Sequence, residues 1–422
     1  MVLMPHWPKE FVRHLDIADL SRIKLIMEKL GNPHKNLPKV IHIAGTNGKG
    51  STCAMLKSIF ESSGRFVHMY TSPHLVNFNE RIIISGEEIS DSLLFKYMER
   101  VRIAYQELDI IPSFFEAITA AAFLAFSENP ADVLILETGI GGRLDSTNIV
   151  EKPIATIITP ISMDHMEYLG NNLSFIAREK AGIIKKAAKS IISMQEENAM
   201  NILLEASENI AAESIAFEYD FVVEKSGNGF KFFSQMGDLE VEKISLVGDH
   251  QIINAGSVIA CILSLNHIFN ISTDQIKEGL AKAHWKGRIQ KVSLSKFPNG
   301  KGLWALLDAA HNPGGAMALN NWIKDQNFTK PLIIFGMTKN RDIKAFLSEF
   351  DVTNVKFFGV PVMSEALSYC SNSLKHEAEK YGFIVEAKDS LPLAIQEAIE
   401  QGFGNQIIIC GSIYLLSDFF KI

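Results

Sequence analysis

The chain has 422 residues, a length for which two domains are the usual expectation. Its hydrophobic content of 47% and charged content of 21% are those of an ordinary globular protein, and its net charge of -7 argues against a general nucleic-acid or membrane-surface binder. The four cysteines are far apart in the sequence, so buried free thiols are expected rather than disulfides or a zinc site. The N-terminus mixes charges and prolines, and no run approaches the ~20 apolar residues that a bilayer requires. We therefore expect a cytoplasmic protein.

Short apolar runs of strand length alternate with amphipathic helical segments along the first part of the chain. A helix is expected after residue 49, and the other expected elements are strands at 40–44, 66–71, 133–137 and 154–159 and helices near 92–108, 115–126 and 173–184. This alternation predicts an α/β fold with a mostly parallel sheet that carries helices on both faces.

A second series of strands begins late in the chain and predicts a smaller, Rossmann-like α/β domain. Its expected strands lie at 303–308, 332–335, 355–360, 383–385 and 406–410. Between the two series, residues 217–247 alternate Phe and Val with polar residues and predict a small antiparallel sheet, followed by a helix over 251–265. The periodicity breaks near 283–288, so we expect one domain at 1–285 and another at 286–422.

The stretch IHIAGTNGKGST, residues 41–52, resembles a phosphate-binding loop in its strand–turn–helix context. Backbone N–H groups at a helix N-terminus favour an anion, the glycines allow close approach, and Lys49 adds a positive charge. Ser51 or Thr52 could offer a hydroxyl to Mg²⁺. The loop departs from the usual pattern, because Ile43 replaces the first glycine and Gly50 separates Lys49 from Ser51. A plain strand-to-helix turn is the alternative, and the combination favours a nucleotide site.

Polar groups also follow three other strands of the predicted first sheet, at the edge where ligands of such sheets collect. Ser72 lies in TSPHL, with Arg81 shortly after it, and Glu137 ends a fully apolar strand, where a carboxylate is costly unless it is paired or binds a metal. A salt bridge from Glu137 to Arg143 is the alternative to a Mg²⁺ site. By itself His165 would be interpreted as a structural histidine, and its position at the end of a third strand makes it a candidate site residue.

Two further motifs contain ionisable side chains. Lys180 lies in the helical segment REKAGI, and its sequence context alone indicates an ordinary half-exposed lysine. The segment DAAHNPG, residues 308–314, ends a strand of the second domain, where its Asp, His and Asn could face a nucleotide.

Together these motifs resemble the Mur ligase family, and most closely its folate branch of dihydrofolate synthases and folylpolyglutamate synthases. GTNGKGS, TSPHL with ERI, LETGIGGRLDSTN, DH with LG, REKAGI, GRIQ and DAAHNP occur in that family's order over nearly the whole chain. The resemblance also accounts for Gly50, which the family carries at this position. One departure is Arg341-Asp342, where the family often has Lys-Asp.

The resemblance implies a set of site residues and cofactors. Nucleotide contacts are implied for Thr46, Asn47, Gly48, Lys49, Gly50, Ser51, Asn254, Arg288, Asp308 and His311. Ser72, Glu137 and His165 would contribute to the binding of two Mg²⁺ ions, and Lys180 would be carbamylated by CO₂ to support the second ion. The folate or pteroate would lie near Leu20, Ser113, Phe114, Leu144, Asp145 and Ser146. Lys49, Lys180 and His165 are the expected catalytic residues.

The implied reaction is ATP-dependent addition of L-glutamate to dihydropteroate and then to reduced folates, through an acyl phosphate. We expect a monomer that acts on small molecules, with no nucleic-acid or membrane partner. A folylpolyglutamate synthase without the first activity and a Mur-type ligase acting on another acid remain alternatives. A phosphate-loop switch that hydrolyses nucleotide to change conformation is the alternative from another class of protein.

Overall fold

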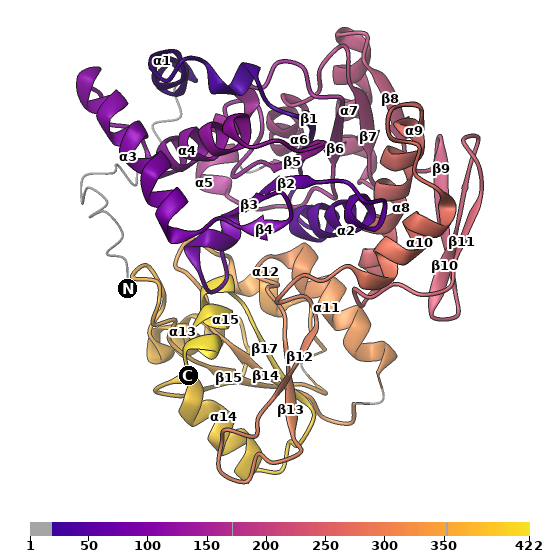
Figure 1. Cartoon of the computed structure of the whole chain (residues 1–422). Coiled ribbons are helices and arrows are strands. Elements are labelled where there is room, and N and C mark those ends of the chain that lie inside the picture. The colour runs from indigo at the N-terminus through magenta and orange to yellow at the C-terminus, as the bar shows by residue number, and fades with distance from the viewer. Residues whose placement is uncertain (1–18, 171, 327, 352) are drawn as a thin grey trace. The chain divides into compact units, whose positions relative to one another are not determined.

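The computed structural model describes residues 19–422 apart from 171, 327 and 352. The chain divides into two compact units. Within the described residues, unit 1 contains 19–161, 172–245 and 251–284, and unit 2 contains Ser162–Gly170, Leu246–His250 and Trp285–Ile422. Both units are α/β, which confirms the predicted fold class (Figure 1). Within the described part of the chain, no helix is long and apolar enough to cross a membrane.

The main sheet of unit 1 is mostly parallel, with strand order β4-β3-β2-β5-β1-β6-β7-β8. Its strands are β1 (Lys39–Ala44), β2 (Val67–Tyr70), β3 (Ile82–Ile84), β4 (Glu87–Glu88), β5 (Val133–Glu137), β6 (Ala155–Ile158), β7 (Lys189–Ile192) and β8 (Glu213–Ala216). Only β3 runs opposite to the other strands, and it pairs antiparallel with both β2 and β4 at one edge of the sheet. In the register of β1 with β5, Ile43 lies opposite Glu137, so the ends of these strands lie side by side.

Helices cover both faces of this sheet. Helices α1 (Ser21–Lys29), α3 (Asp91–Glu107) and α4 (Phe114–Glu128) share one hydrophobic core with Val40, Leu134 and Leu136 of the strands. Alternate strand residues point to the other face. Helix α2 (Lys49–Ser62) packs against α10 (Thr273–Lys282), where Ser58 Oγ donates to the Gly279 carbonyl oxygen. The remaining elements of this part of the chain are η1 (Pro33–Lys35), η2 (Phe78–Arg81), η3 (Ser146–Ile149), α6 (Leu173–Ala181), α7 (Glu197–Asn209), α8 (Asp249–Ser264) and α9 (Asn266–Phe269).

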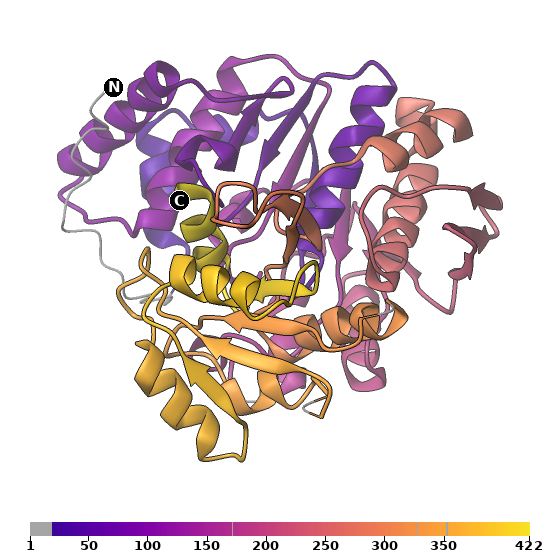
Figure 2. The same ribbon diagram turned by 90° about the horizontal axis from the view of Figure 1, so that it is seen from below.

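The predicted antiparallel excursion is confirmed as a three-stranded sheet of order β11-β10-β9. Its strands are β9 (Phe221–Ser226), β10 (Gly229–Ser234) and β11 (Leu239–Val241), which lie beside α8 in both views (Figures 1 and 2). Gly256 of α8 permits this packing, because a Cβ atom there would lie 2.6 Å from the Val223 side chain.

Unit 2 contains a second sheet, of order β12-β13-β17-β14-β15-β16. Its strands are β12 (Gln290–Ser293), β13 (Trp304–Leu307), β14 (Leu332–Phe335), β15 (Lys356–Gly359), β16 (Val385–Ala387) and β17 (Ile407–Cys410), and its helices are α5 (Met166–Leu169), α11 (Pro313–Asp325), α12 (Ile343–Leu347), α13 (Ser371–Glu379), α14 (Leu391–Glu400) and α15 (Ile413–Lys421). Only β12 is antiparallel to its neighbour. Strand β17 returns between β13 and β14, and such reversals of strand order favour ligands at the carboxyl edge.

The prediction of buried free thiols holds for three of the four cysteines. All four are free, and Cys53, Cys261 and Cys410 are buried, but Cys370 is exposed. The prediction is therefore wrong for Cys370, which lies directly before α13 at the surface of unit 2.

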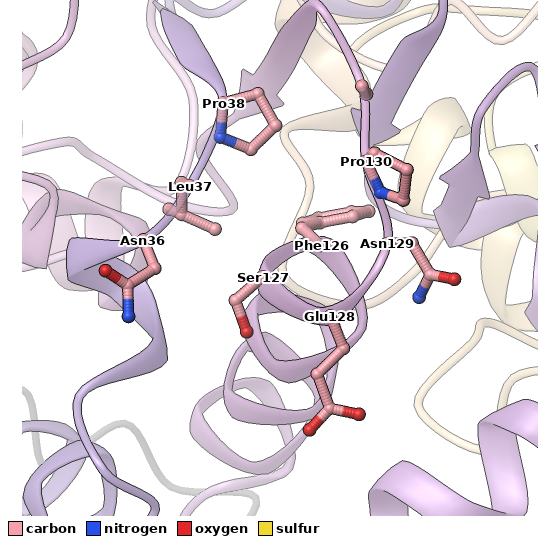
Figure 3. Close-up of a pocket in the computed structure, with 9 residues that line it drawn as sticks. Asn36, Leu37, Pro38, Phe126, Ser127, Glu128, Asn129 and Pro130 are labelled. Atoms are coloured by element: carbon pink, nitrogen blue, oxygen red, sulfur yellow. The ribbon is translucent and has the colours of Figure 1, made fainter.

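A surface hollow lies at the amino ends of β1 and β5, where the α4–β5 turn meets the chain entering β1 (Figure 3). It is lined by Asn36, Leu37, Pro38, Phe126, Ser127, Glu128, Asn129, Pro130 and Ala131. The predicted phosphate loop follows the carboxyl end of β1, at the opposite edge of the sheet. This hollow is therefore separate from the predicted site.

Candidate active site

The predicted phosphate loop connects β1 to the N-terminus of α2. The loop needs glycine at two points, because Gly45 has φ 149° and Gly48 has φ 90°. A Cβ atom on Gly48 would lie 2.4 Å from Asn254 Oδ1, so the loop and α8 approach each other too closely for any other residue. The backbone N–H groups of Thr46 and Asn47 both donate to the Pro160 carbonyl oxygen at 3.1 Å. The helix N-terminus that follows is suited to an anion.

Two lysine side chains reach the same backbone carbonyl of this loop. Lys49 Nζ donates to the Gly45 oxygen at 3.0 Å, and Lys180 Nζ donates to it at 2.7 Å. Lys180 is only 4% exposed, so the interpretation of this residue as a half-exposed helical lysine is wrong. Burial lowers the pKa of Lys180 well below its usual range, and the nearby Lys49 lowers it further. The Lys180 amine is therefore poised to lose its proton.

Two hydroxyls at the start of α2 are buried without a protein partner. Ser51 and Thr52 are fully buried, and neither Ser51 Oγ nor Thr52 Oγ1 makes a hydrogen bond within the described residues. A buried hydroxyl without a partner costs free energy, so groups of this kind require an explanation. Their position at the N-terminus of α2 favours a ligand at this point.

Glu137 lies at the end of β5, where it is 4% exposed and touches the loop after β2. The Ser72 backbone N–H donates to Glu137 Oε2 at 3.0 Å, and the peptide bond from Ser72 to Pro73 is cis. Arg143 pairs with Glu179 at 2.8 Å, so it does not provide the salt bridge to Glu137 that was the alternative to a metal site.

Asp145 organises the glycine-rich loop that follows Glu137. Its Oδ2 accepts the Gly139 and Ile140 backbone N–H groups at 2.8 and 3.1 Å, and its Oδ1 accepts both the backbone N–H and the hydroxyl of Thr147. Burial raises the pKa of Asp145, while these hydrogen bonds oppose the change. The loop also packs tightly on α6, because a Cβ atom on Gly142 would lie 2.7 Å from the Glu179 carbonyl oxygen.

His42 extends this network into the sheet. Its Nε2 lies 2.8 Å from Thr147 Oγ1. Since the Thr147 hydroxyl proton is donated to Asp145, we assign the ring proton to His42 Nε2. His42 is completely buried, and burial lowers its pKa to about 3. Sequence reasoning missed His42, because one polar residue within an apolar strand does not reveal what it contacts.

The predicted folate residues of unit 1 lie around the start of α4 and the Asp145 loop. Leu20 and Phe114 pack on the same core, and Ser113 caps α4 in a reciprocal pair with Glu116. Leu144 and Ser146 flank Asp145 in the loop. The segment DIADLSRI, residues 16–23, is also similar to the N-terminal segment of bifunctional members of the family, and its residues 16–18 lie outside the described part of the chain.

Aromatic rings and a cation lie beside this group, and sequence reasoning described them only in part. The Arg81 guanidinium lies 5.6 Å from the centres of the Phe78 and Phe114 rings. Arg81 Nε also donates to His74 Nδ1 at 2.9 Å, and Arg22 pairs with Glu116 at 3.2 Å. The ERI motif indicated Arg81, but no signal in the sequence pointed to Arg22.

In unit 2, Asp308 holds the chain at the carboxyl end of β13. Its two carboxylate oxygens accept the Ile289 and Ala310 backbone N–H groups at 2.9 and 2.8 Å. Arg288 precedes Ile289, so Asp308 also fixes the backbone beside this predicted nucleotide residue. His311 Nδ1 lies 2.8 Å from the Ala309 carbonyl oxygen.

His165 belongs to the segment Ser162–Gly170, which groups with unit 2. The residue before it, Asp164, forms an ion pair with Arg341 and lies 3.4 Å from His311 Nε2. Asn312 Nδ2 also donates to Asp164 at 3.2 Å. The DH and Arg-Asp motifs contained these residues, but nothing in the sequence paired Asp164 with Arg341, because their separation is set by the fold.

No group of three His, Cys, Asp or Glu side chains in the described residues forms a ready metal site. Mg²⁺ does not require one, because proteins commonly hold it through one or two carboxylates together with substrate phosphates. The Glu137 carboxylate and the Ser72 hydroxyl are oxygen donors of the kind that this ion prefers, beside a phosphate loop. The residues present therefore fit a metal ion that is bound together with a nucleotide.

The fold and the loop at the N-terminus of α2 define a nucleotide-binding α/β protein. Comparison with protein families narrows this class. The Mur ligase middle domain matches residues 43–262, and the dihydrofolate synthetase C-terminal domain matches residues 290–422. The chain belongs to the Mur ligase family, in its branch of dihydrofolate synthases and folylpolyglutamate synthases, which are acid–amino-acid ligases.

Individual relatives agree along nearly the full length. The dihydrofolate synthase/folylpolyglutamate synthase of Bacillus subtilis is 33% identical over 95% of this chain and 94% of its own. The structure of Escherichia coli FolC in complex with DHPP and ADP has a TM-score of 0.85 and 29% identity, and the match covers 96% of this chain and 92% of that one. A bifunctional folylpolyglutamate synthase/dihydrofolate synthase with Mn, AMPPNP and L-glutamate bound has a TM-score of 0.83 and 28% identity, over 98% and 95% of the two chains.

Proposed function

We propose that this protein uses ATP to add L-glutamate to dihydropteroate, giving dihydrofolate, and then to add further glutamates to reduced folates. The observation that carries the proposal is the convergence of Lys49 and Lys180 on the Gly45 carbonyl oxygen, at a helix N-terminus beside Glu137. Relatives of this chain are named for both activities, and relatives have been solved with ADP, an ATP analogue, L-glutamate and a metal.

The proposed nucleotide-binding residues come from both units, and each set is considered by itself. In unit 1, the phosphates would lie against Thr46, Asn47, Gly48, Lys49, Gly50 and Ser51, with Asn254 behind Gly48. The buried, unpartnered Ser51 hydroxyl supports this assignment. Arg288, Asp308 and His311 of unit 2 stay predictions that rest on the family resemblance. In this proposal residues 1–285 bind ATP and the folate, and residues 286–422 form the glutamate ligase domain.

Ser72 and Glu137 are the proposed metal-holding residues of unit 1, and His165 stays a prediction. When bound, Mg²⁺ would neutralise charge that develops on the phosphates during transfer. Glu137 is buried at the end of an apolar strand, where a carboxylate is costly unless it is paired or binds a cation, and this supports its role in holding the metal. The presence of Mn in a relative supports a metal, while the use of two Mg²⁺ ions remains our proposal.

Lys180 is proposed to carry a carbamate. A neutral amine can attack CO₂, forming an N–C bond and releasing one proton, whereas an ammonium cannot. The lowered pKa of Lys180 supports this reaction, because burial favours the neutral amine over the ammonium. The product would be a carboxylate beside the phosphate loop.

The reaction itself needs positioning rather than a protein nucleophile. A carboxylate oxygen of the folate substrate attacks the γ-phosphorus of ATP, and the bond to ADP breaks. The glutamate amine then attacks the acyl carbon, phosphate leaves, and the amine loses a proton. Phosphorylation provides a leaving group that a carboxylate lacks. Lys49 would stabilise the transferring phosphoryl group by its charge.

The acceptor site is proposed at Leu20, Ser113, Phe114, Leu144, Asp145 and Ser146. The nearby Phe78 and Arg81 support a flat, partly anionic ligand, because aromatic rings stack on such molecules and the guanidinium pairs with carboxylates. We propose that the enzyme acts as a monomer on these small molecules.

Product analysis by mass spectrometry tests the proposal. The protein is incubated with ATP, Mg²⁺ and glutamate, and with dihydropteroate or a reduced folate. Both acceptors should gain glutamate residues, with release of one phosphate for each residue added. If only the reduced folates gain glutamate, the protein is a folylpolyglutamate synthase without the first activity. If neither acceptor gains glutamate but another acid is consumed, the protein is a different Mur-type ligase. ATP hydrolysis in the absence of any acid would instead favour a nucleotide switch.

A further inference from the structure

The segment Ser162–Gly170 is held within unit 2 by one buried carboxylate. Asp164 lies in this segment with its side chain only 7% exposed. Its Oδ1 accepts the His165 backbone N–H at 2.8 Å, and its Oδ2 accepts Asn312 Nδ2 at 3.2 Å and lies 3.4 Å from His311 Nε2. Asp164 therefore connects its own segment to the turn after β13.

The turn after β14 provides the positive charge that balances Asp164. Arg341 forms an ion pair with Asp164, and its side chain is 15% exposed. A second contact joins the same two segments, since Asn340 Nδ2 donates to Glu167 Oε1 at 2.9 Å. Two neighbouring residues of one turn thus hold two residues of Ser162–Gly170.

This turn is itself well anchored. The Arg341 backbone N–H donates to the Thr338 carbonyl oxygen at 3.1 Å, and the Lys339 N–H donates to the Leu367 carbonyl oxygen at 2.8 Å. Asp342 then caps α12 by accepting the Ala345 N–H at 2.9 Å. Because the turn is bonded to the loop at Leu367 and to α12, it can position a segment that has little structure of its own.

His165 needs such support. Its backbone is in the left-handed region, with φ 50° and ψ 40°, which is unfavourable for a residue with a side chain. It also precedes α5, a helix of a single turn whose Tyr168 and Leu169 N–H groups donate to the His165 carbonyl oxygen. A single turn of helix is marginal without external contacts. The bond from the His165 N–H to Asp164 fixes the strained residue directly.

We propose that Arg341 and Asp164 are positioning residues, and that the turn 338–342 holds Ser162–Gly170 so that His165 and His311 keep their orientations. The proposal rests on the proposed function for the roles of these two histidines. Arg341 suits the task better than a lysine would, because its planar guanidinium holds a carboxylate in a fixed geometry. This gives a physical meaning to the Arg-Asp pair at 341–342.

The buried ion pair predicts an asymmetric response to substitution. Removing one partner leaves the other charge buried and unpaired, whereas removing both charges avoids that penalty. Arg341→Met should therefore lower the melting temperature more than the double variant Asp164→Asn with Arg341→Met does. Catalysis should not recover in the double variant, because the geometry that holds His165 is lost in both proteins.

The test combines hydrogen exchange of the free protein with steady-state kinetics. In Arg341→Met, exchange of peptides covering 162–170 should become at least about tenfold faster, and kcat/KM should fall roughly 10- to 100-fold. Arg341→Lys, which keeps the charge, should give intermediate values and remains available if Arg341→Met does not fold. Lys375→Met is the matched control, because it removes an exposed ion pair with Glu379 on α13 of the same unit.

Exchange and kcat/KM both within twofold of the unmodified protein would overturn the proposal. Faster exchange with unchanged kinetics would also overturn the positioning role. The exchange measurement needs no substrate, so it separates this proposal from the proposed function. If the unmodified protein makes no folate product while Arg341→Met loosens 162–170, the proposed function fails and the structural connection stands.

Discussion

Two clusters of ionisable groups in this protein differ in whether their side chains have like or opposite charges. In unit 1, Lys49 and Lys180 meet at the Gly45 carbonyl oxygen, so two groups of the same sign share one acceptor. In unit 2, Asp164 and Arg341 form an ion pair that also includes polar groups of the turn after β13. The first cluster brings like groups together, and the second pairs opposite charges.

The electrostatic consequences differ accordingly. Burial beside Lys49 favours the neutral amine of Lys180, whose pKa is lowered well below its usual range. Such an amine is a potential nucleophile, and its environment is suited to an added negative charge. Asp164 and Arg341 each reduce the cost of burying the other, so their cluster is complete without a ligand. We infer that the first cluster takes part in chemistry and the second holds geometry.

Replacing Lys180 with alanine tests the chemical half of this comparison and should have the largest effect. The variant loses both the amine and any carbamate, and we expect kcat/KM to fall by about 10³-fold, as for loss of a principal electrostatic group. Short-chain carboxylic acids added to the assay should restore part of the rate, since they can replace the missing carboxylate.

Lys186→Ala is the control for this experiment, because Lys186 is exposed and follows the same helix. It should leave the rate within twofold. Full activity in Lys180→Ala would contradict both the carbamate and the division of roles between the two clusters.

Gly48→Ala tests whether nucleotide binding at the first cluster depends on the close approach of the loop backbone to Asn254. The new Cβ would lie 2.4 Å from Asn254 Oδ1, in a residue with φ 90°. The loop must shift, and we expect the affinity for ADP or a non-hydrolysable ATP analogue to fall about 100-fold, or roughly 2.7 kcal/mol. Isothermal titration calorimetry measures this directly.

Gly64→Ala is a matched control, since Gly64 also has a positive φ of 76° but no atom lies within 4 Å of its Cβ position. It should cost about 1 kcal/mol of stability without changing nucleotide affinity. Equal affinities for the two variants would contradict the idea that nucleotide binding depends on the close approach of Gly48 to Asn254.

The sequence predicted the scaffold of the first cluster well, for identifiable reasons. The buried parallel strands β1, β5 and β6 are nearly continuous apolar runs, so their pattern is distinctive. The glycines of the loop follow from local geometry, which Gly45 and Gly48 bear out through their positive φ values. The edge strands β3 and β4 were not predicted, because runs of two or three residues contain too little pattern.

Burial and pairing across long separations could not be predicted from the sequence. Lys180 looked half-exposed because its helix shows an ordinary amphipathic pattern, and its burial depends on β1 and the Gly45 loop, 135 residues away. The contacts of His42 with Thr147 span 105 residues, and the pairing of Asp164 with Arg341 also arises only in the folded chain. Local pattern identifies which residues are unusual, and tertiary structure decides what they contact.

His42 provides the mildest test of the idea that burial in unit 1 favours the neutral form of a basic side chain, as it does for Lys180. Its pKa is lowered to about 3 in the fold, whereas an unfolded histidine titrates near 6.5. The unfolded chain therefore binds a proton first as the pH falls. The contribution of neutral His42 is present above pH 6.5 and is lost progressively as the pH falls toward about 3. At pH 5 this loss amounts to about 2 kcal/mol relative to neutral pH.

His42→Gln removes the titration while its side-chain amide can still donate to Thr147 Oγ1. Urea unfolding of the two proteins at pH 7.5 and pH 5 measures the effect. The stability of His42→Gln relative to the unmodified protein should improve by about 2 kcal/mol between the two values, since other groups titrate equally in both. A pH-independent difference for His42→Gln would mean that His42 is protonated as easily in the fold as in the unfolded chain, and that burial does not favour its neutral form.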